Sequence, residues 1–364
     1  MAGHDHPASP TRECFGTMPD GTAVERVTLD NGTLRVQVIG YGAALQSIEV
    51  PDRHASRGNI ALGLRTLEEY VARSPHFGAV AGRYAGRIAQ GRFSLDGRSY
   101  QIPAMHGPHA IHGGIRGFGK RVWTVIEHAA QQVTLALHSR DGEEGFPGAL
   151  DVRVRYRIQG GDLRIDYAAT TDAPTVLNLT NHSYLNLAGE GSGDVLNQVL
   201  TIDADTFLPC DADAIPTGER RPVEGTPFDF RLPAPIGARI RDDDPQLLHT
   251  LGYDHAYLLP GIGLRRAARL DDPASGRRLE VLTTEPALHF YTANNLNGAL
   301  TGPSGRAYRQ SDGVCFETER PQDSPNQPHF PSTVLRPGEH FTSTTIFRFT
   351  VPRSSPCQGL EPAS

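Results

Sequence analysis

Residues 150–169 contain the pattern that most restricts how this chain can fold. Every second side chain is apolar over residues 150–158, and the alternation returns over residues 163–167 after a turn at Gly160-Gly161. Successive side chains of a β-strand point to opposite faces of a sheet, so this pattern predicts two antiparallel strands with one buried face and one wet face.

The same alternation recurs elsewhere along the chain. It is present in residues 34–38, in residues 93–102 around an Asp96-Gly97 turn, and less cleanly in residues 345–351. No rhythm of strand, helix and strand is visible, and the expected helices are short, such as residues 67–73. With 39 Gly and 28 Pro to make turns, the sequence predicts an all-β fold of antiparallel strands with a few short helices.

The length of the chain leaves its domain organisation open between one large domain and two fused ones. Residues 1–12 and 353–364 lack periodicity and are rich in Pro, Ser, Gly and charge, so we expect flexible tails there. His4 and His6 could bind a metal, but a mobile tail is the favoured interpretation. Residues 13–352 are expected to form a single domain.

The charge of the chain favours a neutral small-molecule partner. A formal net charge of −6 provides no basic field for nucleic acid or an anionic membrane. The sequence has no apolar run of roughly 18 residues and no signal peptide, so we expect a cytoplasmic protein, either a monomer or a weak homodimer. The four widely spaced cysteines fit reduced thiols better than disulfides or sulfur-bound metal.

Three polar segments are candidates for chemistry. Residues 178–187 interleave amides, hydroxyls and His182 with apolar anchors, as expected of a strand that projects polar groups from one face. Glu317 lies in residues 315–320, just before a proline-rich loop. His112 precedes two glycines that would let the backbone approach a ligand closely.

Each candidate has a structural alternative. Taken alone, His182 could be a satisfied core histidine, Glu317 a solvated carboxylate at a strand end, and His112 part of an ordinary turn. The spacing of His106, His109 and His112 could also suggest a metal site, but the glycines and proline between them favour a loop.

Five segments, taken in order, resemble the motif series of the aldose 1-epimerases, also called galactose mutarotases. They are Gly82-Arg83-Tyr84-Ala85-Gly86-Arg87-Ile88, His112-Gly113-Gly114, Asn181-His182-Ser183-Tyr184-Leu185-Asn186-Leu187, Gly252-Tyr253-Asp254-His255 and Glu317-Thr318-Glu319. The loop at residues 141–148 is a sixth. Together they span about residues 14–350, and the ordered series is far more specific than any single motif.

The resemblance implies a galactose mutarotase-like β-supersandwich with an open sugar cleft. It implies an isomerase that interconverts the α and β anomers of free aldohexoses of the glucose and galactose type, without metal or cofactor. Glu317 matches the family's general base and His182 its general acid. Arg87, His112 and Asp254 match positions that hold or orient the sugar hydroxyls.

The residue types suit this reaction. Mutarotation removes a proton from the anomeric hydroxyl and delivers one to the ring oxygen, so two groups must converge on one O–C–O unit. With ordinary pKa values, a glutamate base and some imidazolium acid coexist near neutral pH. An unpaired buried Asp254 or Arg87 would be costly, so we expect the two to pair or to line a wet pocket.

Three positions depart from the family pattern. Gly86 replaces a usual Asn, His289 a common sugar-binding Gln, and Glu319 a frequent Gln. Gly86 and His289 are still expected at the sugar site, but the preferred sugar is left open. If Glu319 pointed inward beside Glu317, it would raise the pKa of that base.

Two other functions are compatible with such a fold. The first is a non-catalytic sugar-binding module, against which the retained Glu317 and His182 argue. The second is a β-sandwich carbohydrate lyase or hydrolase, with Glu317 and Glu319 as paired carboxylates. Neighbouring carboxylates on one strand face more often serve structure or binding.

Overall fold

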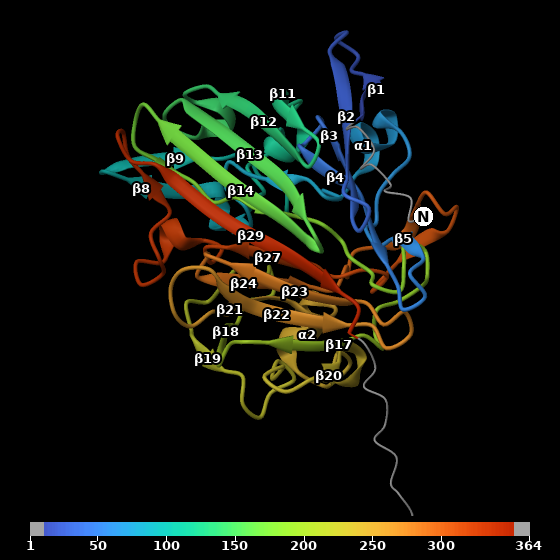
Figure 1. Ribbon diagram of the computed structural model, residues 1–364. Helices are drawn as coiled ribbons and strands as arrows, with labels where there is room; N and C mark the ends of the chain where they lie inside the picture. The colour runs from blue at the N-terminus through green and yellow to red at the C-terminus, as the bar shows by residue number, and fades with distance from the viewer. Residues whose placement is uncertain (1–10, 353–364) are drawn as a thin grey trace, which may run out of the picture.

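The computed structural model describes residues 11–352, and antiparallel strand pairing dominates it (Figure 1). This confirms the all-β prediction. β1 begins at Thr11 and pairs with β2, so Thr11 and Arg12 belong to a sheet and the expected tail of residues 1–12 was drawn too long. His4 and His6 lie outside the described residues.

The largest sheet has nine strands and crosses the whole molecule. Its order is β11 (Thr124–Ala129), β12 (Gln132–Ser139), β13 (Leu150–Gln159), β14 (Asp162–Thr171), β29 (Phe341–Thr350), β23 (Arg278–Thr283), β22 (Arg265–Asp271), β17 (Val199–Ile202) and β20 (Ala234–Pro235). β29 pairs with β14 on one side and with β23 on the other. The last strand of the domain therefore links strands from the middle of the chain to strands from its last third.

Two five-stranded sheets accompany it. One comprises β1 (Thr11–Thr17), β2 (Ala23–Asp30), β3 (Arg35–Ile39), β4 (Ala44–Pro51) and β5 (Arg57–Asn59). The other has the order β19 (Arg221–Pro222), β18 (Thr206–Leu208), β21 (Asp254–Leu258), β24 (Ala287–Tyr291) and β27 (Cys315–Glu319). The second of these sheets carries much of the functional site.

Short pairs and helices complete the fold. The pairs are β6 (Val80–Ala81) with β16 (Thr180–Asn181), β7 (Arg87–Ile88) with β10 (Ala110–Ile111), β8 (Arg92–Leu95) with β9 (Arg98–Gln101), β15 (Thr175–Val176) with β28 (Val334–Leu335), and β25 (Asn297–Thr301) with β26 (Ala307–Arg309). The α-helices are α1 (Leu67–Arg73) and α2 (Pro245–Thr250), and 3-10 turns lie at Ala89–Gly91, Phe118–Lys120, Glu143–Gly145, Ile236–Ala238 and Ser324–Asn326.

The elements with the strongest local patterns form as the sequence predicts. In β13 every second residue is buried, and the β13–β14 register runs from Leu150 opposite Thr171 to Gln159 opposite Asp162. α1 has the predicted bounds and begins with a capping box, in which the Thr66 hydroxyl accepts from the backbone N–H of Glu69 and the Glu69 carboxylate accepts from that of Thr66.

Residues 178–187 differ from the single strand that was expected. Only Thr180–Asn181 is a strand, and the rest follows an irregular, buried path. Leu185 forms bridges to both Ala61 and Val314, so distant segments bond to this backbone on either side. Tertiary pairing has overridden the local alternation.

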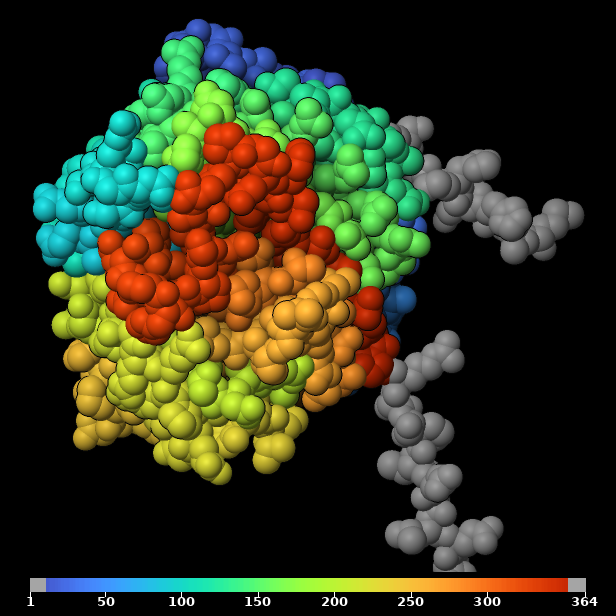
Figure 2. All heavy atoms as spheres, turned by 90° about the vertical axis from the view of Figure 1, so that its left-hand side faces the viewer, coloured from blue at the N-terminus to red at the C-terminus, as the bar shows by residue number. Residues whose placement is uncertain are grey.

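The surface brings together segments that are far apart in sequence. In Figure 2 the β8–β9 hairpin, in cyan, lies against the red segment that contains the Ser324–Asn326 turn, where Asn326 donates to the carbonyl of Arg92.

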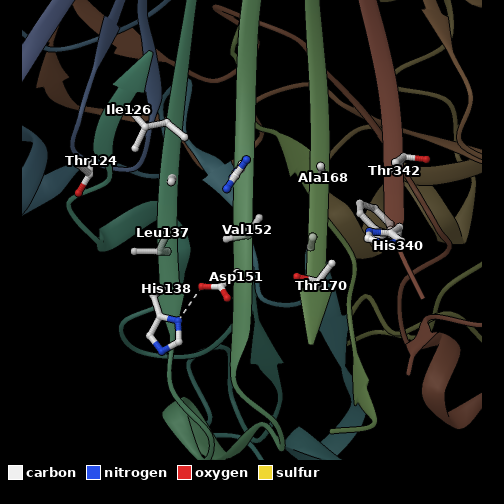
Figure 3. Close-up of a pocket in the computed structure, with 14 residues that line it drawn as sticks. Thr124, Ile126, Leu137, His138, Asp151, Val152, Ala168, Thr170, His340 and Thr342 are labelled. Atoms are coloured by element: carbon white, nitrogen blue, oxygen red, sulfur yellow. Dashed lines mark hydrogen bonds and ion pairs between the residues drawn. The ribbon is translucent and has the colours of Figure 1, made fainter. Parts of the chain in front are cut away.

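The outer face of the nine-stranded sheet is hollowed over about 650 Å³ across β11–β14 and β29, where His138 bonds to Asp151 at 2.8 Å (Figure 3). None of the predicted site residues lines this hollow.

Two further features concern the described residues. No helix within residues 11–352 is long and apolar enough to cross a membrane. The cysteines of this part of the chain, Cys14, Cys210 and Cys315, are all free thiols.

Candidate active site

One face of the sheet β21–β24–β27 forms the floor of a small cavity. His289 on β24 lies directly opposite Glu317 on β27, and Asp254 on β21 lies opposite Tyr291 on β24. Because residues two apart on a strand share a face, all four side chains point the same way. The other face packs its aromatic rings, including Phe290 and Phe316, into the core.

Short strand pairs bring the remaining predicted residues to this floor. His182 follows β16, and its backbone N–H donates to the carbonyl of Ala79 at 2.9 Å. Arg87 on β7 lies opposite Ile111 on β10, so His112 follows beside it. Arg87, His112, His182, Asp254, His289 and Glu317 all line one cavity of about 200 Å³.

Glu317 and His182 face each other across this cavity. Oε1 of Glu317 lies 3.7 Å from Nε2 of His182, and the two residues are 3% and 5% exposed. The His182 ring stacks on Tyr184 at a centroid distance of 5.0 Å, while its Nδ1 has no hydrogen-bond partner within residues 11–352. Packing, rather than a hydrogen bond, therefore orients this imidazole.

Burial moves the pKa values of the pair toward their neutral forms. It raises the pKa of Glu317 well above its ordinary value, and the charge of Asp254 adds to this. It lowers the pKa of His182 to about 3, with His76 contributing next. Burial therefore favours a protonated Glu317 beside a neutral His182, rather than the carboxylate and imidazolium that ordinary pKa values predict.

A second cluster of charge lies beside the pair. Arg87 Nη2 contacts Asp254 Oδ2 at 3.1 Å, and His289 Nε2 lies 2.6 Å from Asp254 Oδ1. Burial alone would raise the pKa of Asp254, but Arg87 and then His289 lower it well below its ordinary range. The expectation that Arg87 and Asp254 pair is confirmed, and the carboxylate stays ionised.

Gln322 fills the space that a side chain at Gly86 would occupy. Gly86 has a φ of +75°, and a Cβ there would lie 2.4 Å from Cγ of Gln322. The Gln322 amide oxygen accepts from the backbone N–H of Arg87 at 3.0 Å, and its nitrogen lies 3.1 Å from Nδ1 of His289. Gln322 thus places an amide group where a side chain at residue 86 would otherwise lie.

His112 is held in one orientation by the backbone of Gly86. The N–H of Gly86 donates to His112 Nδ1 at 3.2 Å, and the N–H of His112 donates to the Gly86 carbonyl at 3.1 Å. Burial lowers the pKa of His112 well below its ordinary value. A neutral imidazole whose Nδ1 accepts must carry its proton on Nε2, which makes that atom a hydrogen-bond donor.

This tautomer bears on metal binding. One ligand atom each of His112, His182 and Glu317 lie within 4.8 Å of one another, a spacing that a metal ion could bridge. A histidine ligates through a nitrogen lone pair, but in His112 the Gly86 N–H already takes the Nδ1 lone pair and Nε2 carries hydrogen. The cluster is therefore better suited to a ligand with hydroxyl groups.

Glu319 lies behind the site rather than in it. It is 1% exposed and does not line the cavity, and its nearest hydrogen-bond donor is Nδ2 of Asn178 at 3.4 Å from Oε2. Burial and then Glu317 raise its pKa. Repulsion between two carboxylates is reciprocal, so Glu319 acts on the pKa of Glu317 in the same upward direction, although burial and Asp254 are the main causes there.

Several cavity residues were not singled out from the sequence. They are His76, Tyr184, Tyr291, Asn295 and Gln322. Tyr184 belongs to the motif of His182, and Gln322 follows Glu317 in the proline-rich loop, so both had a positional signal. His76 lay in no motif.

The family model described as aldose 1-epimerase matches residues 25–348. The chain is 44% identical to galactose mutarotase from Homo sapiens, over 94% of this chain and 99% of that protein. It is 40% identical to aldose 1-epimerase from Escherichia coli K12, over 91% and 96%.

Solved structures with the same fold include two at 29% identity. The aldose epimerase homologue from C. elegans superposes with a TM-score of 0.85 over 91% of this chain and 100% of that one. Galactose 1-epimerase from Lactobacillus acidophilus gives 0.82 over 94% and 98%.

Proposed function

Because this chain belongs to the aldose 1-epimerase family, we propose that its cavity binds a free aldohexose and that Glu317 and His182 exchange protons with it there. The protein is an isomerase that interconverts the α and β anomers of aldoses. The observation that carries the assignment of roles is the 3.7 Å approach of Glu317 to His182 inside a cavity of about 200 Å³.

The size and lining of the cavity suit a single sugar ring. Pockets for drug-sized ligands measure roughly 300–1,000 Å³, so this smaller cavity favours a monosaccharide. Arg87, Asp254 and His289 offer charge-assisted hydrogen bonds to hydroxyls remote from C1. His112 offers an Nε2–H donor to the same ligand.

In the proposed reaction, Glu317 accepts the proton of the anomeric hydroxyl while His182 donates one to the ring oxygen. The C1–O5 bond breaks and gives the open aldehyde, rotation about C1–C2 presents the other face, and the reverse transfers close the ring. Each placed transfer contributes roughly 10²–10⁴ in rate. After one cycle, Glu317 and His182 together carry the same number of protons as at the start.

The proton count of the pair fits this cycle. A neutral Glu317 with a neutral His182 holds as many protons as a carboxylate with an imidazolium, so moving one proton prepares the reactive form. The step needs no change in total charge, which would be costly in a buried site.

Polarimetry on freshly dissolved α-D-glucose and α-D-galactose tests the proposal. We expect the protein to speed the change in rotation and to leave the final rotation unchanged. Binding without acceleration would support a non-catalytic sugar-binding module instead. A new product would support a lyase or hydrolase, although Glu319 lies outside the cavity and so does not provide the second carboxylate.

Cytoplasmic location and a monomeric or weakly dimeric state are also part of the proposal. Size-exclusion chromatography at several protein concentrations tests the second point, and a stable tetramer would contradict it.

A further inference from the structure

His76 lines the cavity but takes no part in the proton transfers described above. It lies between α1 and β6, is half-buried, and has a backbone φ of +72°. This left-handed conformation costs free energy for any residue with a side chain, and such strain concentrates at ligand sites.

The ring of His76 is placed against two histidines of the site. Its centroid lies 4.8 Å from that of His112 and 6.0 Å from that of His182, to which it is nearly parallel at 19°. The segment is anchored to His182, because the N–H of Gly78 donates to the His182 carbonyl at 3.0 Å. His76 and His182 therefore keep a fixed relation.

The polar atoms of the His76 ring are available to a ligand. The His76 side chain lines the cavity and is half-buried, so a ligand in the cavity can reach it. Nδ1 lies close to Gly119, where an added Cβ would come within 3.1 Å of it. Burial, and then Lys120, lowers the pKa of His76 to about 4, and a neutral imidazole can pair with a hydroxyl group.

The position of His76 indicates which part of the sugar it meets. In the proposed function Glu317 serves the anomeric hydroxyl and His182 the ring oxygen, which is bonded to C1 and C5. The ligand atoms of His112, His182 and Glu317 lie within 4.8 Å of one another, and His76 is outside this group. It therefore borders the site beside His112 and His182, away from Glu317 and the anomeric hydroxyl. The sugar position that we assign to it is the C6 hydroxymethyl group on C5, the other carbon bonded to the ring oxygen.

We propose that His76 is a specificity-determining residue that hydrogen-bonds to the C6 hydroxyl of the bound aldohexose. This inference rests on the proposed function and adds a substrate class to it. The site distinguishes aldohexoses from 6-deoxyhexoses, which have a methyl group at that position, and from aldopentoses, which have only hydrogen.

The test compares wild type and His76→Phe on α-D-glucose and 6-deoxy-α-D-glucose by polarimetry. Wild type is expected to prefer glucose in kcat/KM by about tenfold, the effect of one neutral hydrogen bond. His76→Phe is expected to remove this preference by slowing glucose alone. Because the two sugars differ in a single hydroxyl, the ratio isolates that contact.

His76→Asn is the companion variant, since Asn tolerates a positive φ and keeps a polar group. It is expected to retain part of the preference, and thermal unfolding checks that both variants fold. An equal loss on both sugars would overturn the inference by giving His76 only a supporting role for His112 and His182. A wild type that shows no preference for glucose over 6-deoxyglucose would also overturn the inference, and this result does not depend on whether either variant folds. Failure of wild type on every sugar would instead overturn the proposed function.

Discussion

Glu317 and His182, from distant parts of the chain, approach to 3.7 Å where burial favours the neutral form of both side chains. This relationship supplies a base and an acid that share one proton. It also makes each group necessary to the other, because neither can move a proton across the hemiacetal carbon alone.

Glu317→Gln and His182→Asn should each lower kcat/KM for α-D-glucose by about 10²–10⁴, because each removes one positioned proton transfer. Polarimetry measures the rate, and thermal unfolding verifies the fold. Glu224→Gln is the matched control, since the Glu224 side chain is 82% exposed and should keep full activity. Full acceleration in both site variants would refute the assigned roles.

The pH dependence of kcat/KM should show a plateau that begins below the ordinary pKa of histidine and extends well above the ordinary pKa of a glutamate. The pair works with one proton, and it gains a second only near the lowered pKa of His182, about 3. It loses its only proton above the raised pKa of Glu317. Activity should therefore fall at acid pH below the ordinary range of histidine, and again as Glu317 ionises, at a pH well above the ordinary pKa of a glutamate.

The pH profile separates this arrangement from one with ordinary pKa values. With ordinary pKa values, the carboxylate and the imidazolium would coexist only between about pH 4.3 and pH 6.5, and activity would decline above about pH 6.5. A decline with a midpoint near 6.5 that Glu317→Gln leaves in place would contradict the burial argument. Polarimetric rates at low sugar concentration give the values for the free enzyme.

Asp254→Asn should destabilise the protein and raise KM. It leaves the Arg87 guanidinium, 7% exposed, without its counter-charge, and breaking a buried pair typically costs about 3–5 kcal/mol. Asp96→Asn breaks the exposed Arg336–Asp96 pair and should cost at most about 1 kcal/mol. Urea unfolding compares the two variants, and equal effects would show that the cavity pair is solvated like the surface pair.

The elements that could be predicted from sequence are those with a complete local signal. The alternation and Gly160-Gly161 turn specify β13 and β14, and α1 is bounded by its own capping residues. The path of residues 178–187 was not predictable in this way, because its backbone partners, Ala61 and Val314, come from elsewhere in the chain.

The site shows the same division. Glu317, His182 and Arg87 lie in motifs that the sequence displays, so their identity could be proposed before their positions were known. Gln322 and His76 depend on the approach of separate segments. The Gln322 amide occupies the space that a side chain at Gly86 would need, and no spacing along the chain expresses this relationship.

Gly86→Ala should destabilise the protein and weaken sugar binding, because the new Cβ would lie 2.4 Å from Gln322 Cγ and displace the amide that holds Arg87. Gly97→Ala is the control: its φ of +78° imposes similar backbone strain, but its Cβ would meet nothing within 4 Å. The difference between the two unfolding free energies measures the clash alone. If the two unfolding free energies are equal and KM is unchanged, the position of the Gln322 amide beside Gly86 is not required for stability or sugar binding.

Glu319→Gln should stabilise the protein at neutral pH without changing kcat, because Glu319 lies outside the cavity and its pKa is raised by burial. Above the ordinary pKa of a glutamate the unfolded chain releases this proton while the folded chain retains it. Wild-type stability therefore falls as pH rises, by about 1.4 kcal/mol per pH unit, until Glu319 ionises in the folded state.

The glutamine variant lacks this proton and should escape that loss. Its advantage in melting temperature should be smallest near pH 4 and should grow toward neutral pH, as measured by thermal scans across this range. Glu224→Gln, at an exposed site, controls for the loss of a carboxyl group as such. An advantage that is constant with pH would mean that Glu319 is ionised in the folded protein despite its burial and its weak 3.4 Å contact with Asn178.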